Sequence, residues 1–294
     1  MTKFICYGEV LWDLLLTGKV IGGAPLNVAY RLSSFGNETQ LISKIGQDDY
    51  GHGIIDFLKQ SNLNTNLIQT DKGLPTGIVK VTLDNTQSAT YDIVNPVAWD
   101  NIELNKDNTT AVKNANVFIY GSLSARETQS RDTLLELLKL AKYKVFDVNL
   151  RAPHYNREGL ITLMEAADFI KLNNEELHII AGYYDCTTQN MEHQIKTIAT
   201  KTHTKMICVT KGSNGAILYD DGKFYSHNGY SNKVIDTVGA GDAFLATLLH
   251  FKTQEIDLQN ALNYACAMGA LVVNTKGGTT LVGLDELIDF SGCA

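Results

Sequence analysis

Short apolar runs alternate with helical patterns through the second half of this chain, and this alternation constrains the fold more than any other feature. Tyr143–Leu150 and Phe169–Asn173 have the pattern of strands, and Asn174–Gly182 has the pattern of a helix. The strand-like runs are continuously apolar, as in Val117–Tyr120 and Met206–Val209, which is typical of strands buried on both faces. Strands and helices that alternate in this way predict an α/β fold, in which helices cover a parallel sheet.

One stretch breaks this pattern, because two strand-like segments follow one another with no helix between them. Thr76–Leu83 and Ala89–Val94 lie on either side of the polar run 84–86 and predict an antiparallel hairpin with one wet face. Inside an α/β chain, such a hairpin is most simply a flap added to the main sheet. A second hairpin is predicted for residues 216–227, with its turn at Asp221-Gly222.

Charge and composition narrow the classes of function. The 294 residues include 25 Lys and Arg against 32 Asp and Glu, a formal net charge of −7, which argues against a general nucleic-acid binder with a basic face. No apolar stretch reaches roughly 18 residues and the N-terminal run has no signal-peptide form, so we expect no membrane span and a cytoplasmic location. The five cysteines form no CxxC pair and the seven histidines form no HExxH motif, so we expect neither a disulfide framework nor a zinc site.

The most informative segment is the run Asp236–Phe244, DTVGAGDAF. Gly239 and Gly241 lie on either side of an alanine, and Asp242 then opens an apolar helix. Glycine permits close backbone approach, and the first N–H groups of a helix carry partial positive charge, so the segment predicts an anion site. Asp242 would repel a phosphate there unless it is a base that faces an incoming hydroxyl group. The alternative is that Asp242 is simply a first-turn residue favoured by the helix dipole.

A second informative segment runs from Gly22 to Gly36, GGAPLNVAYRLSSFG. Pro25 suits the first turn of a helix, and Gly36 suits its C-terminal end. The predicted helix is apolar nearly all round, so Asn27 would be a buried amide that needs partners. Its side chain could bind the backbone, or it could bind a polyhydroxyl ligand above the Gly-Gly turn.

Polar side chains also follow several predicted strands, at the edge where open α/β sheets bind their ligands. Asp13 comes after the first strand and could accept hydrogen bonds from two sugar hydroxyls, while the ring of Trp12 could cover a sugar face. Arg151 ends the run DVNLR, and its guanidinium could pair with Asp147 or with a phosphate.

Two further segments after strands could serve a nucleotide. Asn173-Asn174-Glu175-Glu176 could cap a helix, or its Glu176 could orient magnesium-bound water near a nucleotide. The run Thr210–Gly215 could cradle a nucleotide, or it could be a plain link between a strand and a turn.

Taken together, these segments resemble the two signatures of the PfkB, or ribokinase-like, family of carbohydrate kinases. The run from Gly22 resembles the first signature and the run from Asp236 resembles the second, while DVNLR, KLNNEE and VTKGSNGA fall in the family's order and spacing. The resemblance covers essentially the whole chain. It implies a single domain over residues 1–294, a ribokinase-like three-layer α/β sandwich with a mostly parallel central sheet, and a small β lid from about residues 10–20 and 75–98.

The resemblance also implies a role for each matched residue, with ATP as phosphoryl donor and Mg²⁺ as its companion ion. The implied catalytic residues are the base Asp242, the anion hole Gly239, Ala240 and Gly241, and the helper Arg151. The implied sugar-binding residues are Asp13, Gly22, Gly23, Asn27 and Trp99, the last of them where the lid returns to the core. The implied nucleotide and magnesium-water positions are Asn173, Glu176, Thr210, Gly212 and Gly215. Asp236 and the Val238 carbonyl match a loop that holds a monovalent cation, such as K⁺, in many relatives.

Departures from the family pattern bear on the substrate. Ribokinases carry a sugar-facing Glu where this chain has Gly121-Ser122-Leu123, whereas Asn95–Asp100 resembles the corresponding segment of fructokinases. We therefore expect an ATP-dependent sugar kinase that makes fructose 6-phosphate, with a small sugar and ATP as its partners and an exposed lid face that offers a homodimer contact. The alternatives are a kinase for ribose, 2-keto-3-deoxygluconate or a nucleoside, a non-catalytic sugar sensor, and a dinucleotide oxidoreductase. The last is disfavoured, because Phe244 stands where the third fingerprint glycine would be.

Overall fold

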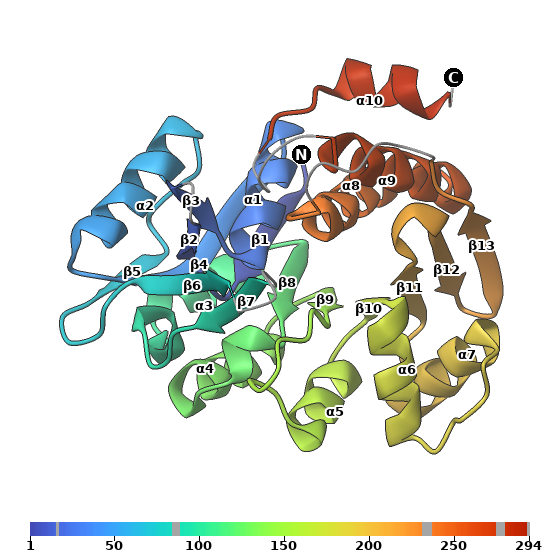
Figure 1. The fold of residues 1–294 in the computed structure, drawn as a ribbon, viewed down its shortest axis with the longest axis horizontal. Helices are drawn as coiled ribbons and strands as arrows, with labels where there is room; N and C mark the ends of the chain where they lie inside the picture. The colour runs from blue at the N-terminus through green and yellow to red at the C-terminus, as the bar shows by residue number, and fades with distance from the viewer. Residues whose placement is uncertain (16–17, 84–88, 231–236, 275–279, 293–294) are drawn as a thin grey trace.

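The computed structural model describes residues 1–15, 18–83, 89–230, 237–274 and 280–292 (Figure 1). Its strands are β1 (Lys3–Tyr7), β2 (Leu11–Leu15), β3 (Gly18–Gly22), β4 (Glu38–Gly46), β5 (Ile68–Asp71), β6 (Gly77–Leu83), β7 (Ala89–Ile93), β8 (Val117–Gly121), β9 (Lys144–Asp147), β10 (Phe169–Asn173), β11 (Met206–Thr210), β12 (Ala216–Asp220) and β13 (Lys223–His227). Its α-helices are α1 (Ala24–Ser34), α2 (Asp49–Gln60), α3 (Lys106–Asn114), α4 (Thr128–Leu138), α5 (Arg157–Glu165), α6 (Asn174–Tyr183), α7 (Met191–Thr202), α8 (Ala240–Thr253), α9 (Leu258–Val272) and α10 (Leu284–Ser291).

The larger sheet is mostly parallel, as the sequence predicts. Its strands lie in the order β13-β12-β11-β10-β9-β8-β1-β4-β5, and every neighbouring pair from β11 to β5 is parallel. The predicted hairpin of β12 and β13 adds an antiparallel edge, and its turn residues Asp221 and Gly222 have the positive φ of a tight hairpin turn. The strand order reverses on either side of β1, so the carboxyl ends near β1 form the crevice where such sheets bind ligands.

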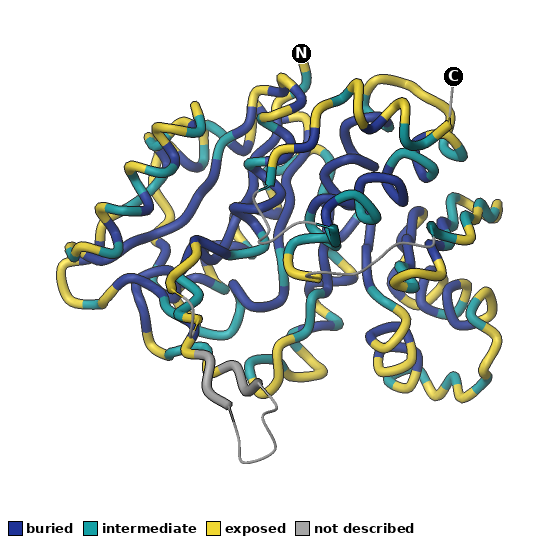
Figure 2. Tube along the Cα trace, turned by 45° about the horizontal axis from the view of Figure 1, so that its top comes forward, coloured by how far each residue is buried: buried dark blue, intermediate teal, exposed yellow. Residues whose placement is uncertain are grey.

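Two layers of helices cover the two faces of this sheet (Figure 1). Alternate residues of β1 point to opposite faces, so Phe4 and Cys6 join one core cluster and Ile5 and Tyr7 join the other. Residues of α1, α2, α8, α9 and α10 pack in the first cluster, and residues of α3 to α7 pack in the second. Figure 2 shows the strands of the large sheet buried between outer helix faces that are exposed. The described residues thus form the predicted three layers, and they include no helix with the length and apolar character that crossing a membrane requires.

The smaller sheet contains the predicted hairpin. Its strands lie in the order β3-β2-β6-β7, in which β6 and β7 are antiparallel as predicted, and β2 pairs in parallel with β6. The turn predicted at residues 84–86 lies outside the described residues. The first pair of strands spans residues 11–22 and the second spans residues 77–93, so this sheet is built from two distant stretches of chain.

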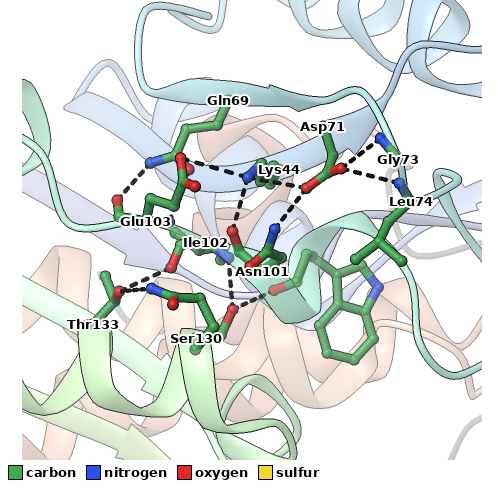
Figure 3. Close-up of polar contacts among 12 residues, drawn as sticks. Lys44, Gln69, Asp71, Gly73, Leu74, Asn101, Ile102, Glu103, Ser130 and Thr133 are labelled. Carbon is green, nitrogen blue, oxygen red and sulfur yellow. Dashed lines mark hydrogen bonds and ion pairs between the residues drawn. The ribbon is translucent and has the colours of Figure 1, made fainter.

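A polar network holds the segment after β7 against the edge of the larger sheet (Figure 3). Lys44 Nζ in β4 lies 3.0 Å from Asp71 Oδ2 and donates a hydrogen bond to the carbonyl oxygen of Asn101. Asn101 Nδ2 in turn donates to Asp71 Oδ2 at 2.8 Å. Because Lys44 and Asp71 are both buried, these bonds compensate each charge for its lost hydration and fix the point from which the smaller sheet extends.

Candidate active site

The two signature-like segments meet at one hydrogen bond. Asn27 Nδ2 in α1 donates to Asp242 Oδ2 in α8 at 2.8 Å, although the two residues are 215 positions apart in the sequence. Helices α1 and α8 pack side by side on the same face of the sheet, and Pro25 lies in the first turn of α1 as predicted (Figure 1). Asn27 Oδ1 is buried and has no hydrogen-bond partner among the described residues, which suits a site that a polar ligand completes.

The first turn of α8 has the geometry expected of an anion site. Gly239 caps the helix with φ of 77°, a left-handed conformation that glycine adopts without steric cost. Ala240, Gly241 and Asp242 form the first turn, where backbone N–H groups lack acceptors within the helix and carry partial positive charge. The helix is anchored behind this turn, because Ala243 and the residues that follow it to Phe251 are buried.

A buried ion pair lies beneath this turn. Asp147 ends β9 and Lys171 lies beside it in β10, where the two residues are direct cross-strand partners. Lys171 Nζ donates to both carboxylate oxygens of Asp147, at 3.0 and 3.1 Å. A Cβ atom at Gly241 would lie 3.1 Å from Lys171 Nζ, so the ammonium reaches the underside of α8. Asp147 therefore pairs with Lys171, which corrects the alternative that Arg151 pairs with it.

Burial and neighbouring charges raise the pKa of the carboxyl group that faces the anion site. The pKa of Asp242 rises to about 6, first because of burial and then because of the Asp147 carboxylate, while Lys171, Asn27 and Arg151 act in the opposite direction. A base whose pKa lies near the working pH is well matched to accepting a proton from a hydroxyl group.

Asp13 lies close to the Gly22-Gly23 turn. Burial raises the pKa of Asp13 to about 6, and the charge of Arg151 opposes this rise. A Cβ atom at Gly22 would lie 2.5 Å from Asp13 Oδ2, and one at Gly23 would lie 2.5 Å from the carbonyl oxygen of Glu9. The Gly-Gly turn therefore lets the strand that carries Asp13 approach the start of α1 closely.

Arg151 is exposed in the loop after β9. Its Nη1 donates to the carbonyl oxygen of Leu150 at 2.9 Å, and its charge opposes the rise in the pKa of both Asp13 and Asp242. The guanidinium is thus close enough to act on the predicted sugar-binding Asp13 and the predicted base Asp242, and its exposure leaves it accessible to an anion.

The predicted nucleotide-binding residues gather at the ends of β10 and β11. Asn173 and Thr210 are cross-strand partners there. The Asn173 side chain caps α6, and Glu176 accepts hydrogen bonds from the N–H groups of Asn173 and Leu150, at 2.8 and 2.7 Å. Of the two alternatives for Glu176, the structure thus contains the cap.

The two glycines of the neighbouring turn differ in what requires them. Gly212 opens a short 3-10 helix with φ of 56° and open space around it. A Cβ atom at Gly215 would lie 2.0 Å from the carbonyl oxygen of His227 at the end of β13, so any other residue would collide with that strand. Only the first of the two therefore has room for a ligand at its Cα.

The two tryptophans predicted to contact the sugar, Trp99 and Trp12, pack against protein side chains. Trp99 is only 1% exposed, and the Arg126 guanidinium lies 3.9 Å from its ring centroid, so no free ring face remains for a sugar. A Cβ atom at Gly77 would lie 2.5 Å from Trp99 Nε1, which places the ring under the start of β6. Trp12 donates its Nε1 hydrogen bond to Tyr50 in α2 and packs against that residue.

The predicted monovalent-cation position is described only in part. Asp236 lies outside the described residues, as do residues 275–279. Val238 precedes α8 and is 46% exposed.

Two charged residues of this site, Glu9 and Lys171, were not predicted from the sequence. Burial raises the pKa of Glu9 to about 7, with a further rise from Asp242, and its Oε2 has no partner among the described residues. Both residues had a signal in the sequence, because Glu9 directly follows the first apolar strand and Lys171 interrupts the apolar strand FIKLN. A charge in a strand that is buried on both faces needs a partner. For Lys171 that partner is Asp147 in the neighbouring strand β9.

Comparison with known proteins agrees with this arrangement. The model of the pfkB family of carbohydrate kinases matches residues 3–283. A fructokinase of Solanum tuberosum is 28% identical over 297 residues, which cover 93% of this chain and 90% of that protein.

Two solved structures share the fold over nearly the whole chain. An uncharacterized sugar kinase from Pyrococcus horikoshii superposes with a TM-score of 0.84 at 28% identity and covers 99% of each chain. A fructokinase from Vibrio cholerae, solved with fructose, ADP and a calcium ion, superposes with a TM-score of 0.83 at 25% identity and also covers 99% of each chain. The family match spans both signature-like segments and the strand ends between them. The chain belongs to the pfkB family of carbohydrate kinases and is an ATP-dependent sugar kinase.

Proposed function

We propose that this kinase transfers the γ-phosphoryl group of ATP to the 6-hydroxyl of fructose, with Asp242 as the base. The observation that carries the proposal is the hydrogen bond from Asn27 to Asp242. It joins a predicted sugar-binding residue to the predicted base at the anion site, where a sugar hydroxyl would be deprotonated. The Vibrio cholerae relative was solved with fructose and ADP, which supports this choice of acceptor.

Each group of the site has one task in this reaction. Asp13, Asn27 and the Gly22-Gly23 turn bind the sugar, and Asp242 accepts the proton of the attacking hydroxyl. The N–H groups of Gly239, Ala240 and Gly241 stabilise the charge on the phosphoryl group, and Arg151 adds positive charge from the loop after β9. Phosphoryl transfer depends mainly on positioning and electrostatics, so a carboxylate base is sufficient.

The nucleotide would lie along the ends of β10 and β11, against Asn173, Thr210 and Gly212, while Gly215 would shape the turn behind it. Mg²⁺ usually keeps several waters when it binds phosphate oxygens. Each carboxylate oxygen of Glu176 accepts one backbone hydrogen bond and has a further lone pair, so the cap leaves Glu176 able to accept a bond from such a water. Asn173 and Glu176 would hold a magnesium-bound water, and the ion would supply positive charge to the phosphate oxygens when bound.

A panel of acceptors tests the choice of sugar. Release of ADP is measured with fructose, ribose, 2-keto-3-deoxygluconate and a nucleoside under one set of conditions. We expect fructose to give the highest kcat/KM. A tenfold preference for any other acceptor would overturn the assignment and keep only the kinase activity.

The smaller sheet should act as a lid over the sugar, because a kinase must exclude water that would otherwise accept the phosphoryl group. Saturating fructose should slow amide exchange in residues 76–83 and 89–94 and leave β8 unchanged. Unchanged amide exchange in both stretches would contradict either the role of the lid or the choice of fructose. Slower exchange with ribose alone would support the lid and contradict fructose as the substrate.

Potassium should raise activity if a cation binds near Asp236 and the Val238 carbonyl, because its charge would add to the potential of the anion site. Rates in matched sodium, potassium and choline salts test this, and equal rates would reject it. A homodimer through the smaller sheet and a cytoplasmic location also remain predictions.

A further inference from the structure

The ion pair of Lys171 and Asp147 occupies an unusual place for two buried charges. The side chains are 8% and 6% exposed, and they join the last residue of β9 to the middle of β10, beneath the first turn of α8. A buried ion pair gains little stability over an apolar pair of similar volume, because both charges lose their hydration. Its presence directly below the proposed anion site therefore calls for a reason other than stability.

The surroundings keep the Lys171 ammonium charged. Burial favours the neutral amine, but the Asp147, Glu176 and Asp242 carboxylates outweigh burial and raise the pKa of Lys171. Gly241 lets this charge come close, since a Cβ atom there would lie 3.1 Å from Lys171 Nζ. A fixed positive charge thus lies on the inner side of the turn whose N–H groups face outward.

We propose that Lys171 is a positioning residue for phosphoryl transfer, held by Asp147 so that its charge adds to the positive potential of the first turn of α8 and acts on Asp242 from below. The inference rests on the proposed role of Asp242 as the base. It assigns Asp147 the task of holding the ammonium in place, at the cost of placing a second negative charge near Asp242.

The charges around Asp242 set the sign of the expected effect. The groups that act on it come from α1, from β1 and the loop after it, from β9 and its loop, and from β10: Asn27, Cys6, Glu9, Asp147, Arg151 and Lys171. Asp147 raises the pKa of Asp242 and Lys171 lowers it. Removing Asp147 alone should therefore make Asp242 more acidic, and removing Lys171 as well should reverse that change.

The test compares Asp147→Asn with the double variant Asp147→Asn/Lys171→Met. Neither introduced side chain titrates, so the difference between the two variants isolates the charge of Lys171. In the wild type, kcat/KM should fall as the pH drops through about 6, because a protonated Asp242 cannot accept a proton. In Asp147→Asn this acidic limb should move to lower pH, and in the double variant it should move back up by roughly 1 pH unit or more, the usual effect of a nearby opposite charge.

A matched pair elsewhere in the chain provides the control. Lys44 and Asp71 form a buried pair of the same type, also 3.0 Å apart, and the bonds of Lys44 go to residues outside the site (Figure 3). Asp71→Asn and Asp71→Asn/Lys44→Met should lower the unfolding temperature without moving the acidic limb. If the acidic limb of kcat/KM moved equally in the Asp147/Lys171 variants and in the Asp71/Lys44 variants, the shift would reflect a general loss of stability. That result would overturn the inference.

The outcomes separate this inference from the proposed function. If Asp242→Asn retains near-normal turnover, the base assignment fails and the inference fails with it. If Asp242→Asn is inactive but Asp147→Asn and the double variant share one acidic limb, the kinase mechanism stands and the role of Lys171 is wrong. If the double variant does not fold, Asp147→Asn/Lys171→Gln makes the same comparison, because its two amides can hydrogen-bond to each other. A limb above that of Asp147→Asn supports the inference, and a limb shared with Asp147→Asn overturns it.

Discussion

Replacing Asp242 with Asn should lower kcat by roughly 10²–10⁴-fold, the usual worth of a positioned base, while sugar and ATP still bind. The amide has nearly the shape of the carboxylate, and α8 is anchored by its buried residues from Ala243 onward, so the first turn should keep its position. What is lost is the ability to accept a proton from the attacking hydroxyl.

Steady-state kinetics and calorimetric titration of fructose and ATP on the purified variant measure both parts of this result. An unchanged circular dichroism spectrum serves as the control for folding. Near-normal turnover would remove Asp242 from the mechanism, whereas loss of binding together with turnover would give it a structural role instead.

Gly23→Ala should have the second largest effect, because the added methyl group would meet backbone rather than a movable side chain. A Cβ atom there would lie 2.5 Å from the carbonyl oxygen of Glu9, and the φ of Gly23 is 113°, which an alanine rarely adopts. We expect a loss of roughly 1–3 kcal/mol in the free energy of unfolding, as for overpacked sites. Because the turn places both Asp13 and the start of α1, kcat/KM should also fall, by roughly 10²-fold.

Gly18→Ala is the matched control for this variant. Gly18 lies in β3 with φ of 138°, so its substitution carries a similar backbone strain, but its Cβ atom would meet nothing within 4 Å. Denaturant unfolding and fructose kinetics on the two variants separate the collision from the strain. Equal losses in the two would contradict the claim that the close approach at Gly23 shapes the sugar site.

The architecture could be predicted because burial leaves a direct trace in the sequence. The continuous apolar runs Val117–Tyr120 and Met206–Val209 indicated strands covered on both faces, and they lie buried in β8 and β11. The predicted strand Phe169–Asn173 has the predicted limits in β10. The predicted strand Tyr143–Leu150 was too long, since β9 ends at Asp147. Asn149 has φ of 38°, so the chain leaves the sheet there although its residues remain apolar enough to continue a strand.

The contacts of the site were harder to predict, because they depend on how elements pack. Asn27 and Asp242 were each identified as unusual, but their hydrogen bond exists only because α1 lies beside α8. The partner of Asp147 depends on strand register, which sets it opposite Lys171 and leaves Arg151 in the loop beyond. The charges of Asp147, Asp242 and Lys171 therefore act on one another, although the spacing of these residues along the chain does not reveal it.

Phosphorus NMR of a reaction with fructose and ATP tests the central claim most directly, because it identifies both the acceptor atom and any transfer to water. We expect equal amounts of ADP and fructose 6-phosphate, with no inorganic phosphate beyond the rate seen without enzyme. Fructose 1-phosphate would show that the site presents a different hydroxyl to Asp242. ADP that appears only with inorganic phosphate, in the presence of saturating fructose, would contradict the account of a sugar site joined to the anion site.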